Sequence, residues 1–107
     1  MRITLAILFL FSSLGAEKYN LAICSIFQDE AKYLCEWIEF HQKQGVEHFF
    51  LYNNLSQDNY QEKLIPYIDE GLVTLIDVPE KHNTQEEWNT IQCESYMRFI
   101  HDYGQEC

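Results

Sequence analysis

The sequence predicts an α/β fold in which a Rossmann-like parallel sheet is built in the order βαβαβα. Three short apolar runs, at residues 21–27, 46–52 and 72–78, alternate with segments whose apolar residues recur at helical spacing. A glycine follows each of these segments, which is a common way for a helix to end. Strands that alternate with crossover helices of this length favour a parallel sheet with right-handed connections.

The first strand and helix are expected at residues 21–27 and about 30–44. The strand is an almost continuous apolar run, which is typical of a strand buried on both faces. Gly45 supplies the stop signal of the helix. The apolar side of this helix has the spacing i, i+3, i+4 and i+7, at Leu34, Trp37, Ile38 and His41.

The second strand is expected at Val46 to Tyr52, and a second helix follows it. Asp58 and Gln61 have the spacing of a reciprocal N-cap, so we expect the helix to begin there. Pro66 lies inside this helix and is expected to kink or break it, because proline has no backbone N–H to donate. The inward positions are Tyr60, Leu64 and Ile68, and Gly71 ends the helix.

A third strand and helix complete the pattern. The strand is expected at Leu72 to Val78, where Pro79 ends it. The segment from Thr84 to Glu87 is a capping box, the signature of a helix N-terminus. One face of the helix that follows carries Trp88, Ile91, Ser95 and Phe99, before Gly104.

Residues 1–16 have the pattern of a signal peptide that is cleaved from residues 17–107. Arg2 gives a short positive start, residues 3–11 are apolar, and small residues follow as far as Ala16. The apolar stretch is about half of the ~20 residues that a membrane-spanning helix needs. We therefore expect an exported protein, in the bacterial periplasm or secreted, or in the ER or Golgi lumen of a eukaryote, that meets a membrane only through this segment. The alternative is a buried N-terminal strand.

The cysteines and histidines show no metal-binding pattern. Export favours an oxidising compartment, and the sequence does not choose among the three disulfide pairings of Cys24, Cys35, Cys93 and Cys107. No C-x-x-C occurs, which argues against structural zinc. The histidines share no ligand spacing and are expected to be structural: His41, His48, His82 and His101.

The chain is strongly acidic, with 7 Lys and Arg against 17 Asp and Glu and a formal net charge of −10. An excess of this sign repels phosphate backbones, so we expect no DNA or RNA partner. Hydrophobic residues make up 47% of the 107 residues, which is enough apolar surface for a single folded domain.

Polar side chains follow two of the expected strands at the point where each strand ends. Asp29 and Glu30 follow the first strand, and the run from Asn53 to Asp58 follows the second. The carboxyl ends of neighbouring parallel strands line one crevice, where ligands bind in open α/β sheets. Carboxylates and amides there can accept hydrogen bonds from ribose hydroxyls and pair with a base edge, and we expect them to be exposed. The alternative for Asp29, Ser56 and Asp58 is that they only cap helices.

Three motifs together resemble glycosyltransferase family 92, formerly domain of unknown function 23. They are Glu-Trp-Ile-Glu-Phe-His at 36–41, Gly-Val-Glu-His-Phe at 45–49 and Asn-Asn-Leu-Ser-Gln-Asp at 53–58. The resemblance covers roughly residues 21–103 and implies the N-terminal half of a GT-A domain. It also implies a nucleotide-sugar donor, a divalent cation (Mn²⁺ or Mg²⁺), and transfer of the sugar to a glycan, protein or lipid acceptor.

The resemblance assigns roles by position. Asp29 and Glu30 occupy the first-strand loop of the family. Four residues match the motif that contacts base and ribose in related transferases: Asn53, Asn54, Ser56 and Asp58. Relatives often carry Asp at the place of Asn53, so this chain keeps a hydrogen-bond acceptor there but loses a charge. Gln92 matches a glutamine that recurs before the family's catalytic strand, and its alternative is an ordinary helix residue.

The sequence lacks the motif on which sugar transfer depends. A GT-A enzyme holds its cation with Asp-x-Asp at the end of the next strand, and no Asp-x-Asp occurs in these 107 residues. We therefore expect the chain alone to be inactive, as a truncated or split product whose C-terminal half is encoded downstream. The edge of strand 21–27 would then be exposed, unless a further strand or a partner covers it. The other hypothesis is a small secreted α/β binding or interaction protein without catalysis.

Overall fold

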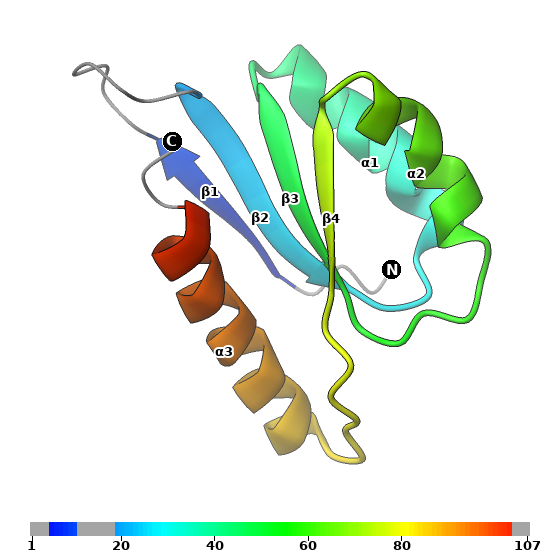
Figure 1. Ribbon diagram of the computed structural model, residues 1–107, viewed down its shortest axis with the longest axis vertical. Coiled ribbons are helices and arrows are strands. Elements are labelled where there is room, and N and C mark those ends of the chain that lie inside the picture. The colour runs from blue at the N-terminus through cyan, green and yellow to red at the C-terminus, as the bar shows by residue number, and fades with distance from the viewer. Residues whose placement is uncertain (1–4, 11–18, 104–107) are drawn as a thin grey trace.

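The computed structural model describes residues 5–10 and 19–103, which form one sheet with helices on both faces (Figure 1). The sheet has 4 strands in the order β1-β2-β3-β4. In chain order the elements are β1 (Leu5–Leu10), β2 (Leu21–Phe27), α1 (Ala31–Lys43), β3 (His48–Asn53), α2 (Tyr60–Asp69), β4 (Val73–Asp77) and α3 (Gln85–Tyr103). Within these ranges no helix is long and apolar enough to cross a bilayer.

Strands β2, β3 and β4 run parallel, which confirms the predicted α/β fold. Ser25 lies opposite Leu51 in the β2–β3 pair, and Leu51 lies opposite Leu75 in the β3–β4 pair. Helix α1 connects β2 to β3, and α2 connects β3 to β4. The carboxyl ends of the three parallel strands therefore reach the same edge of the sheet.

Strand β1 covers the edge of β2 that we expected to be exposed. Leu5–Leu10 pairs with β2 in the antiparallel direction, with Leu5 opposite Ile26 and Leu10 opposite Leu21. The expectation of an open β2 edge is therefore wrong for this chain, because part of the expected export segment pairs with it. This strand agrees with the alternative interpretation of that segment, whereas cleavage and export stay predictions. Residues 1–4 and 11–18 lie outside the described ranges.

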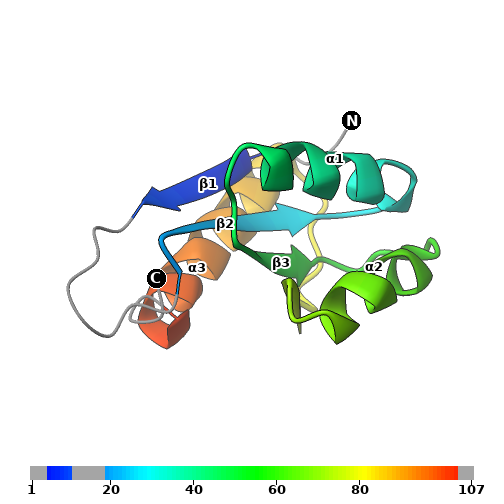
Figure 2. The ribbon, with the colours of Figure 1, turned by 90° about the horizontal axis from the view of Figure 1, so that it is seen from above.

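The side chains of the sheet alternate between two hydrophobic cores. On one face Ile23 and Phe27 pack with α1 and α2, and on the other face Ala22, Cys24 and Ile26 pack with α3. Figure 2 shows α3 on the opposite side of the sheet from α1 and α2. Because β2 is buried on both faces, its apolar run shows no polar alternation, as the sequence pattern predicts.

Of two helix signals predicted from the sequence, the capping box of α3 forms and the break at Pro66 in α2 does not. The N–H of Glu87 donates to the Thr84 hydroxyl at 3.1 Å, as expected for the capping box before α3. Helix α2 continues from Tyr60 to Asp69 through Pro66, so the predicted break does not occur. The missing proline N–H removes one hydrogen bond, and the buried Leu64 on the inner side of α2 keeps the helix packed on the sheet.

The cysteines lie on separate elements of the fold. Cys24 is buried in β2, Cys35 is half-buried in α1 and Cys93 is exposed on α3. No disulfide joins any two of these three residues in the part of the chain that the structure describes. Cys107 lies outside that part, so pairings that include it stay predictions.

Candidate nucleotide site at the carboxyl edge of the sheet

The loops after β2 and β3 are joined to each other by hydrogen bonds. The backbone N–H of Asp29 donates to the Ser56 hydroxyl at 2.9 Å, and the N–H of Gln57 donates to Oδ1 of Asp29 at 2.7 Å. The N–H of Ser56 donates in turn to Oδ1 of Asn53 at 3.0 Å. The parallel sheet therefore brings the predicted site residues of the two loops together. Their polar groups, however, form hydrogen bonds with one another.

Asp58 begins a helix, although not the helix that the sequence suggests. Its Oδ2 accepts the N–H of Ala31, the first residue of α1, at 2.9 Å. Asn59, not Asp58, stands at the N-cap of α2, and its side chain accepts no capping hydrogen bond from the backbone of that helix, so the predicted reciprocal cap of Asp58 and Gln61 is wrong. The reason is tertiary, because the loops after β2 and β3 lie side by side and the carboxylate reaches the neighbouring helix.

Asn53 and Asn54 are buried, so the expectation that these strand-end side chains are exposed is wrong. Nδ2 of Asn53 donates to Oδ1 of Asp77 at 3.1 Å. Nδ2 of Asn54 donates to the carbonyl oxygens of Val78 and Glu80, at 2.9 and 2.8 Å. The two amides therefore tie the end of β3 to the chain that leaves β4.

A pocket of about 430 Å³ opens beside these loops. Its lining comes from the segments that follow all three parallel strands: Gln28 and Asp29 after β2, Leu55 and Gln57 after β3, and Lys81, His82 and Asn83 after β4. Ligands bind at this place in open α/β sheets. Of the residues predicted from the sequence, only Asp29 lines the pocket.

The other predicted residues lie behind or beside the pocket. Glu30 is 3% exposed, and its Oε2 has no hydrogen-bond partner among the described residues. Gln92 is buried on α3 next to Tyr96. Ser56 and Asp58 hold the loops together from outside the lining.

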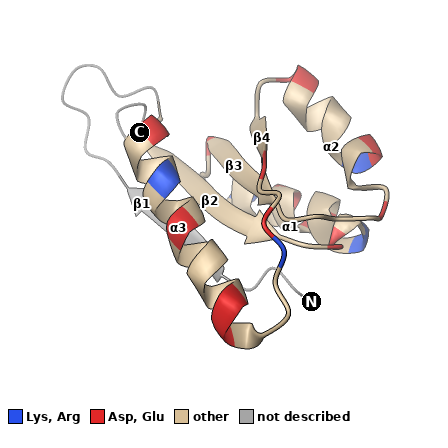
Figure 3. Cartoon of the chain, turned by 60° about the horizontal axis from the view of Figure 1, so that its bottom comes forward, with Lys and Arg blue, Asp and Glu red and all other residues tan. Residues whose placement is uncertain are grey.

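The segment after β4 lines the pocket, although no site residue was predicted there. Its run from Pro79 to Asn83 is polar and follows a predicted parallel strand, which is the same signal that identified the first two strand ends. Lys81 lies on this segment. Figure 3 shows a basic residue in blue on this segment, whereas most of the charged residues on the helices are acidic and drawn in red. The pocket therefore has a cationic side chain, Lys81, on the side formed by the segment after β4.

Backbone strain coincides with this pocket. Asp29 and Leu55 both have a φ of 54°, and they are the non-glycine residues with positive φ in the described chain. A leucine in the left-handed region costs about 1–2 kcal/mol, because its Cβ approaches the carbonyl oxygen that follows. Residues held in this way are concentrated at functional sites. Both of them line the pocket.

The comparison with known proteins agrees with the motifs. The family described as Glycosyltransferase family 92 matches residues 18–102 of this chain. The chain belongs to glycosyltransferase family 92. The match includes β2 and every element that follows it as far as Asp102 of α3, and therefore each segment that lines the pocket.

Plant proteins of family 92 are similar over a shorter stretch. A family 92 protein of Arabidopsis thaliana is 40% identical over 47 residues, which are 44% of this chain and 8% of that protein. A family 92 protein of Ricinus communis is 31% identical over 55 residues, 51% of this chain and 10% of that protein. The chain thus matches about a tenth or less of the length of these relatives. No solved structure matches the chain.

Within residues 5–10 and 19–103, this family 92 chain offers no cluster of side chains that fits a divalent cation. In the described ranges no group of three or more His, Cys, Asp or Glu residues could hold a metal ion. Oδ1 of Asp29 and Oδ2 of Asp58 already accept backbone N–H groups, which reduces their capacity to bind a cation. We therefore assign no metal ligand within this segment.

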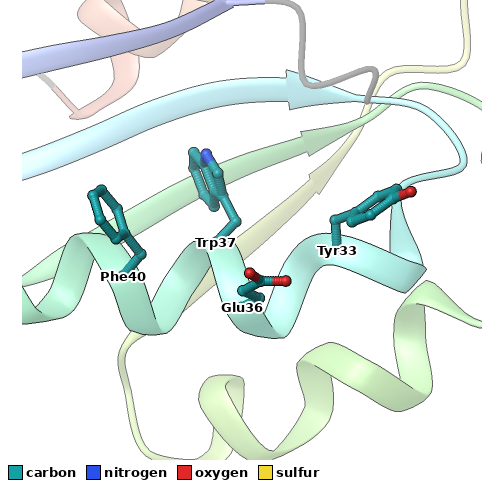
Figure 4. A pocket seen from close by; sticks show the side chains of 4 residues that line it. All are labelled: Tyr33, Glu36, Trp37 and Phe40. Atoms are coloured by element: carbon teal, nitrogen blue, oxygen red, sulfur yellow. The ribbon is translucent and has the colours of Figure 1, made fainter.

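A second pocket, of about 370 Å³, lies along α1 (Figure 4). Tyr33, Glu36, Trp37 and Phe40 line it, and Figure 4 shows the three aromatic side chains on one side of the helix. Phe40 is 59% exposed, whereas the Trp37 ring packs on Phe49 of β3 at 5.5 Å between centroids. None of the predicted site residues lines this second pocket.

Proposed function

We propose that this chain is the donor-binding part of a glycosyltransferase and that it binds a nucleotide sugar in the pocket at the carboxyl edge of the sheet. Membership of family 92 supports the transferase class. The main support for the proposal is the pocket itself, because its lining residues follow all three parallel strands. Its volume of about 430 Å³ is within the usual range of small-molecule sites.

The chemistry of the lining suits a nucleotide. Asp29 uses one carboxylate oxygen to hold Gln57, so its second oxygen can accept a hydrogen bond from a ribose hydroxyl. The side-chain amides of Gln28, Gln57 and Asn83 can both donate and accept hydrogen bonds. The loops are positioned by the hydrogen bonds of Asn53, Asn54, Ser56 and Asp58. Glu30 and Gln92 are buried and support the site without lining the pocket.

Sugar transfer itself needs more than these 107 residues. The diphosphate leaving group must be neutralised, and the Asp-x-Asp by which GT-A enzymes hold Mn²⁺ or Mg²⁺ does not occur in the sequence. We propose that a C-terminal half encoded downstream supplies the cation site, the catalytic base and the acceptor site for a glycan, protein or lipid. Export through residues 1–16 would place this reaction outside the cytoplasm.

Nucleotide binding by the chain tests the proposal. UDP with Mn²⁺, at ten times its Kd, should stabilise the fold by about 1.4 kcal/mol and raise Tm by roughly 5 °C. The amide signals of Gln57 and Asn83 should shift in NMR spectra. Gln57→Ala should weaken binding, whereas Gln42→Ala, the same change on an exposed part of α1, should not.

Two results would overturn the proposal. If neither UDP, GDP nor their sugar conjugates raise Tm or shift these signals, the chain is better described as a non-catalytic α/β interaction protein. If the shifts occur only along α1, around Tyr33 and Trp37, the ligand lies in the second pocket and the assignment of the site is wrong.

A further inference from the structure

In the described part of the chain, β1 is the strand that runs against the other three. Leu5–Leu10 pairs with β2 in the antiparallel direction, whereas β2, β3 and β4 are parallel to one another. The family match begins at residue 18, so β1 also lies outside it. The edge of β2 is therefore covered by a segment that the family match does not include.

The position of α3 shows where a strand that follows it would enter the sheet. Helices α1 and α2 lie on one face and carry the chain from β2 to β3 and on to β4, whereas α3 lies on the opposite face (Figure 2). Connections between parallel strands are almost always right-handed, so a helix on the opposite face carries the chain in the opposite direction. A parallel strand after α3 would therefore lie beside β2, on the edge that β1 occupies.

Aromatic contacts place the end of α3 near the amino end of β2. The ring of Tyr103, the last residue of α3, lies 4.9 Å from the ring of Phe50 on β3, measured between centroids. The Phe50 ring also contacts the ring of Tyr19, two residues before β2 begins, at 6.1 Å. A strand that follows α3 would therefore start level with the beginning of β2 and run along it in the same direction.

The edge of β2 offers one row of backbone groups to whichever strand lies beside it. The carbonyl oxygens of Leu21 and Phe27 accept hydrogen bonds from N–H groups at the two ends of β3. Backbone groups point to alternate sides along a strand, so those of Ala22, Cys24 and Ile26 face the opposite edge, where β1 lies. An antiparallel or a parallel strand can use this row, but only one of them at a time.

We propose that β1 is a replaceable cover and that the β2 edge binds, in its place, a parallel β-strand of the C-terminal part of the transferase. The inference rests on the proposed function, which assigns the rest of the reaction to that part. The incoming strand should be apolar, because β2 beside it is buried on both faces. Until it arrives, residues 5–10 protect an edge that would otherwise recruit other chains. Cleavage of the export segment, which the sequence predicts, would uncover the same edge.

A disulfide can report whether β1 is in place. Ile7 lies directly opposite Cys24, and such pairs are about 5.5 Å apart between Cα atoms, a distance that a disulfide spans. The Ile7→Cys variant of the 107-residue chain is refolded in a glutathione buffer, and its bond to Cys24 is measured by mass spectrometry. Leu8→Cys is the matched control, because Leu8 lies opposite Ile23 and successive side chains point to opposite faces of a sheet.

The probe is a parallel strand attached after α3. The Ile7→Cys chain is extended beyond Cys107 by a short glycine-serine linker and a second copy of residues 48–53, a sequence that already pairs with β2 in the parallel direction. The control extension carries proline at alternate positions of the copy, because proline cannot donate to a strand ladder. The strand copy should lower the disulfide yield about fivefold, since fewer chains have β1 in place, and the proline copy should leave the yield unchanged.

Two results would overturn the inference. A disulfide yield that the strand copy leaves unchanged would show that β1 is a permanent part of the sheet. Equal yields from Ile7→Cys and Leu8→Cys would show that β1 does not hold the edge in register. If Ile7→Cys does not fold, the NOE between the Hα atoms of Leu8 and Ile23 reports the same pairing in the otherwise unchanged extended chains.

These results are separate from the test of the proposed function. Nucleotide binding is measured on the unchanged chain, so a failed strand exchange leaves the donor site standing. If the unchanged chain binds no nucleotide, the proposed function fails whatever the disulfide yields show.

Discussion

The carboxylate of Asp58 accepts the backbone N–H of Ala31 at 2.9 Å, although the two residues are 27 positions apart in the chain. This bond supplies α1 with the N-cap that its own sequence lacks, because Glu30 makes no side-chain capping bond. The negative charge also lies at the positive end of the helix dipole. A loop predicted to bind a ligand therefore also begins a helix.

Asp58→Ala should lower the free energy of unfolding by about 1 kcal/mol, the usual value of a lost N-cap. Asp58→Asn should cost less, because its amide oxygen can still accept the N–H of Ala31. Urea unfolding measures both. Asp69→Ala, an equivalent change on the exposed surface of α2, is the control. Equal effects of Asp58→Ala and Asp69→Ala would mean that the cap has no energetic role.

Asn54 should tolerate substitution poorly, since its side chain is 0% exposed and its Nδ2 donates to two carbonyl oxygens. Asn54→Asp has the same shape but turns a donor into a buried carboxylate that faces these oxygens. We expect a loss of about 3 kcal/mol or more. Asn89→Asp is the matched control, because Asn89 is exposed and accepts a hydrogen bond through Oδ1, which aspartate keeps.

If Asn54→Asp does not fold, Asn54→Ser is the milder variant. It should remain folded and shift the NMR signals of Lys81 and His82, because Asn54 holds the chain that leads to them. Unchanged signals in that segment would show that Asn54 does not position the pocket lining.

Tyr52 should make the fold sensitive to alkaline pH. Burial, with smaller contributions from Cys24 and Tyr103, raises the pKa of the Tyr52 hydroxyl well above its ordinary value. The folded chain therefore keeps a proton that the unfolded chain releases near pH 10, so stability is fully present below pH 10 and falls as pH rises above it. The loss is about 1.4 kcal/mol per pH unit for one such tyrosine.

Tyr52→Phe should remove that part of the alkaline loss. At pH 7 it should leave the free energy of unfolding unchanged or raise it slightly, because the Tyr52 hydroxyl is buried and has no hydrogen-bond partner in the described residues. Urea unfolding at pH 7 and pH 11 measures both effects, with Tyr33→Phe on the exposed side of α1 as the control. A steeper alkaline loss in Tyr52→Phe would contradict the assignment.

Removal of residues 1–18 should expose the edge of β2 that pairs with β1. An apolar strand with unpaired backbone groups recruits other strands, so the shortened chain should associate at concentrations where the full chain does not. Light scattering during size-exclusion chromatography measures this difference. Hydrogen exchange should also accelerate at the β2 amides that face β1. A shortened chain that stays monomeric at high concentration would show that the edge is harmless.

Local patterns in the sequence were sufficient for the order of elements. The apolar run at Leu21–Phe27 predicts a buried strand by itself, and the spacing around Leu34 and Ile38 predicts the face of α1 that packs on it. Three strands in alternation with helices then imply parallel pairing, and the motifs imply the family. Each of these features depends on neighbours within about 20 residues, so one sequence can reveal them.

The site depended on contacts that no local pattern contains. Asn54 and Glu30 are of residue types that often bind ligands, yet both are buried. His82 was expected to be structural, and the structure places it in the pocket lining, with an Nε2 atom that has no hydrogen-bond partner among the described residues. The sequence by itself determined that polar loops gather at one edge of a parallel sheet. Only the tertiary structure decided which side chains hold the loops and which line the pocket, because hydrogen bonds between loops 27 residues apart form after the strands align.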